Sequence, residues 1–158
     1  MVQHQLRDAE TGLYNEAFFA ASVPSRLASA KRALRPLSIV VLAVGGPQPG
    51  VVDTAPATSR EVAYGLLRTL RESDLACRLD NGRFGLLLDE TAADGAVLTV
   101  DRFRALLDEQ DARHHLWAGV ATYPTHALDS TSLLLAAEGA LRDAMAWRQS
   151  RIELAVAS

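Results

Sequence analysis

Hydrophobic positions change between helical and strand-like spacing along the chain, and these changes predict its elements. Apolar residues recur at helical spacing over 15–33, a helix that Pro24 could interrupt. Residues 37–44 form a nearly continuous apolar run rich in β-branched residues, which is typical of a strand buried on both faces. After a loop over 47–56, a second helix is expected from an N-cap at Ser59 to about Glu72.

The second half of the chain shows the same alternation. Short apolar runs at 75–79 and 84–88 flank Asn81-Gly82, a dipeptide that favours a type I′ turn and hence an antiparallel hairpin. A third helix is expected after a cap at Thr91, and it carries Val97, Val100, Phe103 and Leu107. The remaining predicted elements are a strand over 115–123, a helix over 131–147 and an edge strand over 152–156.

From residue 37 to residue 123 the predicted order is β, α, β, β, α, β. This order defines an α+β fold with a ferredoxin-like βαββαβ core, here with flanking helices and a central sheet that is antiparallel or mixed. A length of 158 residues suits one domain, 1–158, whose core we expect to run from about residue 8 to 157. Fold class alone does not decide function, because this architecture serves enzymes and binding modules alike.

Composition narrows the classes of partner. A formal net charge of -3 gives no general field that attracts nucleic acid or an anionic membrane. No apolar run is long enough for a membrane span, and no signal peptide is recognisable, so we expect a cytoplasmic protein. Cys77 is the only cysteine, and the histidines at 114, 115 and 126 lack the spacing of a metal site.

Several segments, in order, resemble the GGDEF family of bacterial cyclic di-GMP synthases, which are diguanylate cyclases. The resemblance rests on Asp8-Ala9-Glu10-Thr11-Gly12-Leu13-Tyr14-Asn15 (family pattern D-x-L-T-G-L-x-N), on the strand at 37–44, on Arg71 to Leu79, on Trp117-Ala118-Gly119-Val120-Ala121 (S-x-G-x-A) and on Ala137-Glu138-Gly139-Ala140-Leu141 (A-D-x-A-L). It implies the cyclase-like fold and a role in second-messenger signalling.

The resemblance also shows where this chain departs from the enzymes. Family cyclases hold two divalent metals with acids on the first strand and in the signature hairpin. The first-strand positions are Ala43 and Gly45, and the signature turn reads Asp80-Asn81-Gly82-Arg83-Phe84. The family's helix lysine is Met145. We therefore expect a degenerate domain that is not an enzyme and needs no Mg²⁺ or other cofactor; Asp80 or Asp53 offers only a minor route to a substitute metal site.

A second family motif is retained. Arg71-Glu72-Ser73-Asp74 matches the R-x-x-D inhibitory-site motif that precedes the signature turn, and an ungapped count places the family's second arginine at Arg102. A guanidinium can donate to O6 and N7 of guanine, and a carboxylate can accept from N1 and N2. The resemblance thus implies that Arg71, Asp74 and Arg102 bind cyclic di-GMP. An ordinary surface ion pair between Arg71 and Asp74 is the plain alternative.

Three hypotheses remain open. The first is a cyclic di-GMP receptor that signals through an effector protein or a homodimer. The second is a ligand-free pseudoenzyme that serves as a dimerisation or docking module. The third is a cyclase with residual activity at an unusual site.

Overall fold

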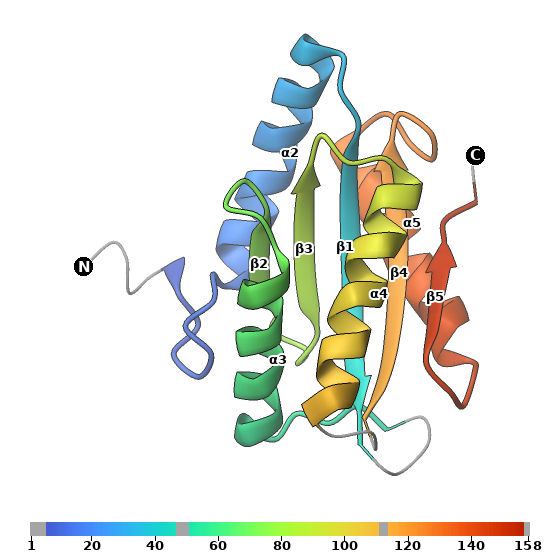
Figure 1. The fold of residues 1–158 in the computed structure, drawn as a ribbon. Coiled ribbons are helices and arrows are strands. Elements are labelled where there is room, and N and C mark those ends of the chain that lie inside the picture. Colours follow the sequence, from blue (N-terminus) through green and yellow to red (C-terminus); the bar gives the residue numbers. More distant parts are fainter. Residues whose placement is uncertain (1–5, 47–50, 111–113, 157–158) are drawn as a thin grey trace.

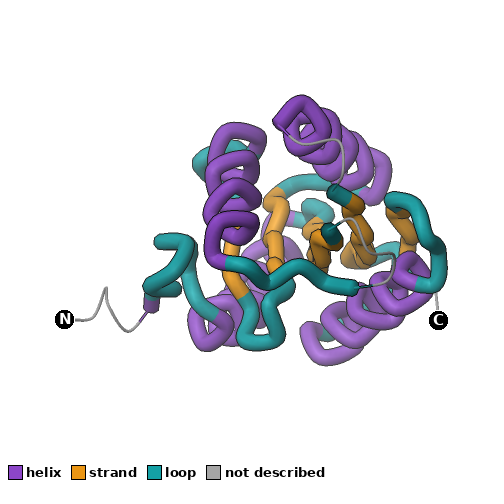
Figure 2. The backbone as a smooth tube through the Cα atoms, turned by 90° about the horizontal axis from the view of Figure 1, so that it is seen from below, coloured by secondary structure: helices purple, strands orange, loops and turns teal. Residues whose placement is uncertain are grey.

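Five strands form one sheet with two helices on each face (Figures 1 and 2). The computed structural model describes residues 6–46, 51–110 and 114–156. Its elements are α2 (Glu16–Ala33), β1 (Leu37–Gly45), α3 (Pro56–Thr69), β2 (Leu75–Arg78), β3 (Phe84–Asp89), α4 (Ala93–Gln110), β4 (His115–Tyr123), α5 (Ser130–Met145) and β5 (Arg151–Leu154). Residues 47–50 of the predicted loop and residue 157 of the predicted core lie outside the described residues.

The strand order is β2-β3-β1-β4-β5, and this confirms the ferredoxin-like core with a mixed sheet. The pairs β2–β3, β1–β3 and β1–β4 are antiparallel, whereas β5 joins β4 in parallel after the crossover through α5. The predicted hairpin and edge strand are therefore confirmed. At the opposite edge, Arg78 N donates to Tyr14 O at 2.8 Å, so the N-terminal segment covers β2.

The central strand β1 is buried along its whole length, as its nearly continuous apolar run predicted. One face of the sheet packs against α2 and α5, and the other packs against α3 and α4. Pro24 lies inside α2 without interrupting it, although an interruption at this residue was considered in the prediction. Both Pro24 and Ala20 are exposed, so the carbonyl that loses its helical partner faces solvent.

Two predicted helix caps are wrong. Helix α3 begins at Pro56 rather than after Ser59, and proline suits this first position because its fixed φ is already helical. Ser59 is buried inside the helix, and its hydroxyl has no hydrogen-bond partner among the described residues. Helix α4 begins at Ala93, and the Thr91 hydroxyl bonds outside that helix.

His126, in the loop between β4 and α5, is expected to make the stability of the fold depend on pH. Its Nδ1 accepts a hydrogen bond from Thr122 N at 2.8 Å. Burial lowers the pKa of His126 from its ordinary value, because a dry site disfavours the imidazolium. The unfolded chain therefore binds a proton as the pH falls through roughly 6.5 while the folded chain resists it. Neutral His126 therefore makes its full contribution to the free energy of unfolding above this pH, and the contribution decreases as the pH falls below it.

We therefore expect the free energy of unfolding in urea to fall between pH 7.5 and pH 5.5. The fall should be smaller in His126→Asn, whose side-chain oxygen can keep the hydrogen bond to Thr122 without titrating. Equal losses in the two proteins would show that His126 does not carry this dependence.

Candidate functional site

The Arg71–Asp74 segment forms a tight turn between the end of α3 and the start of β2. Asp74 N donates to Arg71 O at 3.0 Å and closes the turn. The two side chains face each other across it, with 55% of the Arg71 side chain and only 3% of the Asp74 side chain exposed. The sequence-predicted pair is thus brought together, but only its arginine is presented to solvent.

Arg71 is held by four acceptor atoms. Asp74 Oδ2 accepts from Nε at 3.3 Å, and Oδ1 accepts from Nη2 at 3.1 Å. Nη2 also donates to Asp89 O at 2.7 Å and to Thr91 Oγ1 at 2.9 Å. The adjacent carboxylate of Asp74 raises the pKa of Arg71, so the guanidinium is charged at every relevant pH. Within the described residues, no protein group bonds to Nη1.

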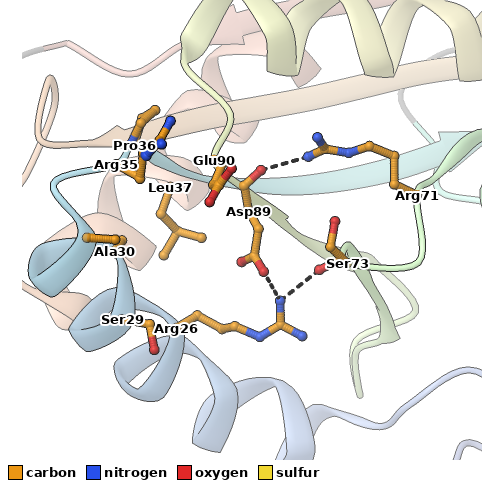
Figure 3. Close-up of a pocket in the computed structure, with 11 residues that line it drawn as sticks. Arg26, Ser29, Ala30, Arg35, Pro36, Leu37, Arg71, Ser73, Asp89 and Glu90 are labelled. Atoms are coloured by element: carbon orange, nitrogen blue, oxygen red, sulfur yellow. Dashed lines mark hydrogen bonds and ion pairs between the residues drawn. The ribbon is translucent and has the colours of Figure 1, made fainter.

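A cleft of about 360 Å³ lies beside Arg71 and is lined by α2 and by the ends of β1 and β3 (Figure 3). Arg26 crosses it from α2 and donates through Nη1 to Ser73 O at 2.8 Å and to Asp89 Oδ2 at 2.7 Å. Arg35 and Glu90 complete its charged lining. Arg26 was not predicted from the sequence, because its partners Ser73 and Asp89 lie 47 and 63 positions away along the chain and no local motif marks the arginine.

Arg102 lies apart from this turn. It is exposed on α4, nine residues after the helix begins, which is about 14 Å along the helix axis. In the described part of the chain no hydrogen bond or ion pair joins Arg102 to Arg71 or Asp74. Contact of all three residues with one bound molecule therefore needs a ligand that spans the gap or a second protomer.

The signature turn keeps the hairpin but not the predicted type I′ geometry. Gly82 N donates to Leu79 O at 3.1 Å, and Leu79 N donates to Arg83 O at 2.8 Å. The loop therefore has three residues, and in it only Gly82 has a positive φ, of 82°. This is the arrangement of a type I turn followed by a glycine bulge. The side chain of Asn81 is used to accept from Arg83 N at 3.1 Å, which stabilises the wider loop.

Asp80 sits at the tip of that loop beside Glu16, the first residue of α2. Glu16 Oε1 accepts from Asp80 N at 3.4 Å. Burial raises the pKa of Glu16, and the nearby carboxylate of Asp80 raises it further. The carboxylates of Glu16 and Asp80 therefore interact with each other, and Glu16 also accepts a hydrogen bond from the backbone of Asp80.

The positions corresponding to the family's first-strand acids are filled by core packing. Ala43 is fully buried. A Cβ placed on Gly45 would lie 2.6 Å from Cη2 and Cζ3 of Trp117, a side chain that is itself fully buried. Trp117 occupies the serine position of the S-x-G-x-A pattern and donates from Nε1 to Trp147 O at 3.0 Å. The indole thus fills the space that a carboxylate at residue 45 would need.

The residues present do not fit a two-metal site. Neither Ala43 nor Gly82 offers a side-chain ligand. Asp53 is engaged in starting α3, since its carboxylate accepts from Ala55 N and from Thr58 Oγ1, each at 2.9 Å. Over residues 6–46, 51–110 and 114–156, no group of three or more His, Cys, Asp or Glu side chains is arranged to hold a metal ion.

Comparison with known proteins identifies the class. The family model described as diguanylate cyclase, GGDEF domain, matches residues 58–151, which is more than half of the chain. The chain belongs to the GGDEF domain family. No match was found among curated protein sequences. No helix in the described ranges is long and apolar enough to cross a bilayer.

Solved structures agree with this assignment. The GGDEF domain of YfiN (TpbB) from Pseudomonas aeruginosa is 26% identical, with a TM-score of 0.80 over 95% of this chain and 94% of that one. DgcB from Caulobacter crescentus, solved in complex with cyclic di-GMP, is 18% identical, with a TM-score of 0.81 over 98% and 87% of the two chains. A microbial GGDEF domain described in a novel interaction mode with cyclic di-GMP is 20% identical, with a TM-score of 0.83 over 97% and 98%. The last two show the fold alone.

Proposed function

We propose that this chain is a degenerate, non-enzymatic GGDEF domain that acts as a cyclic di-GMP receptor through its R-x-x-D motif. The observation that carries the proposal is the exposed guanidinium of Arg71, which is fixed by Asp74 and lines a cleft that also contains Arg26, Arg35, Asp89 and Glu90. A planar, pre-oriented guanidinium suits the acceptor edge of guanine and the phosphates of a cyclic dinucleotide. Two relatives of the same fold were characterised with this ligand.

In this proposal the three predicted residues have different roles. Arg71 contacts the ligand, and Asp74 orients Arg71. Only 3% of the Asp74 side chain is exposed and both of its oxygens already accept from Arg71, so a guanine has little access to this carboxylate while the ion pair is in place. Arg102 would meet a second guanine of a stacked ligand, or a ligand bound to another protomer, because of its position along α4.

The absence of catalysis follows from the residues that replace the acids. Ala43, Gly45 and Gly82 cannot bind metal through a side chain, and Arg83 places a positive charge where the family has an acid. Trp117 also occupies the space beside Gly45. Such a receptor would act in the cytoplasm, where the ligand-bound surface is read by an effector protein or a second protomer.

Isothermal titration calorimetry of the wild-type protein tests the receptor function. We expect saturable binding of cyclic di-GMP and weaker or no binding of cyclic di-AMP, whose adenines lack the acceptor at position 6. No heat with cyclic di-GMP at high micromolar concentration would leave the docking module as the better reading. Incubation with GTP and Mg²⁺ or Mn²⁺, followed by chromatography, should give no cyclic product; a product would establish the cyclase instead.

A further inference from the structure

Thr91 lies between β3 and α4, where a threonine would ordinarily cap the following helix. Its hydroxyl instead donates to Asp89 O at 2.7 Å and accepts from Arg71 Nη2 at 2.9 Å. The hydroxyl therefore connects the end of β3 to the guanidinium of the R-x-x-D motif, although the two segments are 20 residues apart in sequence.

A count of donors shows what this contact does. A guanidinium has five N–H groups, one on Nε and two on each terminal nitrogen. The Nε–H points to Asp74, and the two hydrogens of Nη2 are shared among Asp74 Oδ1, Asp89 O and Thr91 Oγ1. In the part of the chain that the structure describes, neither hydrogen of Nη1 has a protein acceptor, so both remain for a ligand. The acceptors around Nη2 thus select which edge of Arg71 is presented.

Thr91 is itself anchored from inside the sheet. The hydroxyl of Ser38 donates to Thr91 O at 2.7 Å and lies 2.8 Å from the hydroxyl of Thr122. Ser38 and Thr122 are buried in the central strands β1 and β4. Two buried hydroxyl groups therefore fix the backbone of Thr91, and the Thr91 side chain passes this constraint on to Arg71.

We propose that Thr91 is a positioning residue for cyclic dinucleotide binding at Arg71, an inference that rests on the proposed receptor function. Removing its hydroxyl takes one acceptor from Nη2 and one donor from Asp89 O. The guanidinium can then turn about its Cδ–Nε bond, and the binding-competent orientation becomes less populated. Apparent affinity falls in proportion to that population.

The test compares Thr91→Val, which has nearly the same shape without the hydroxyl, with Thr91→Ser, which keeps it. By calorimetry we expect cyclic di-GMP to bind Thr91→Val about tenfold more weakly than the wild type, and Thr91→Ser within about twofold of it. In NMR spectra of the ligand-free protein, the Arg71 Nε–H signal should be retained in Thr91→Ser and shifted or broadened by exchange in Thr91→Val. Urea unfolding monitors the fold of each variant, and Thr91→Ala replaces valine if that variant does not fold.

The outcomes distinguish a failure of the positioning role of Thr91 from a failure of the proposed receptor function. If the wild type binds and Thr91→Val binds equally well, or if Thr91→Ser is as weak as Thr91→Val, the positioning role is overturned while the receptor stands. If the wild type does not bind cyclic di-GMP at all, the receptor function fails and the positioning role fails with it.

Discussion

Arg71→Ala is expected to weaken cyclic di-GMP binding by about 100-fold. The substitution removes two charge-assisted hydrogen bonds from Nη1, each contributing about 1.5 kcal/mol, and each 1.4 kcal/mol corresponds to a factor of ten in affinity. It also leaves the buried carboxylate of Asp74 without its main partner. Calorimetric titration at constant salt concentration measures the change directly.

Arg68→Ala is the matched control for that experiment. Arg68 is also an exposed arginine, located in the last turn of α3, but its guanidinium lies over the Tyr64 ring and is not part of the R-x-x-D turn. Its removal changes the net charge by the same amount and should leave affinity within about twofold, because exposed and screened charges contribute little. Equal losses in the two variants would mean that binding follows overall charge and not the motif.

Gly119→Ala is expected to destabilise the folded chain by about 3 kcal/mol or more. A Cβ at residue 119 would lie well inside contact distance of Ala137 O and Leu141 N, and 2.9 Å from Ala140 C. These are backbone atoms of α5, so relief requires the whole helix to move away from β4. Urea unfolding should show a large fall in the midpoint, or a variant that does not fold.

Gly139→Ala provides the comparison within the same helix. Its Cβ would meet only the end of the Arg142 side chain, at 3.5 Å, and that group can move. Alanine is favoured over glycine in a helix by about 0.8–1 kcal/mol, so this variant should be slightly more stable than the wild type. A mild effect of Gly119→Ala would show that α5 does not pack against β4 as closely as the structure has it.

The elements and their order could be predicted because their signals are local. The apolar run of β1 and the apolar stripes of the helices indicate which faces of these elements are buried. Turns and helix caps were harder to predict. Asn81-Gly82 is compatible with two loop geometries, and the wider one is favoured by a bond within the loop, from Arg83 N to Asn81, and by one to another segment, from Asp80 N to Glu16. Thr91 has the chemistry of a helix cap, but Arg71 and Asp89 compete for its hydroxyl.

In the candidate site, too, contacts between residues close in sequence could be predicted, whereas contacts that depend on tertiary packing could not. The meeting of Arg71 and Asp74 follows from a separation of three residues and was expected. Arg26 and the cleft that it crosses depend on how α2 lies against the end of β3, which no short segment encodes. The approach of Trp117 to Gly45 depends on strand register, because Trp117 pairs with Ala43 and so lies diagonally opposite Gly45 on the neighbouring strand.

The position of Trp117 restricts which side chains residue 45 can carry. An acid introduced at Gly45 has no room while the indole is there, so a substitution at residue 45 alone cannot place a carboxylate at that position. Shrinking Trp117 would make the room, but truncation of a fully buried tryptophan costs about 3–5 kcal/mol, a large share of the stability of a domain of this size. The chain therefore depends for its stability on the side chain that fills the space beside residue 45, and making room there for an acid would weaken the fold.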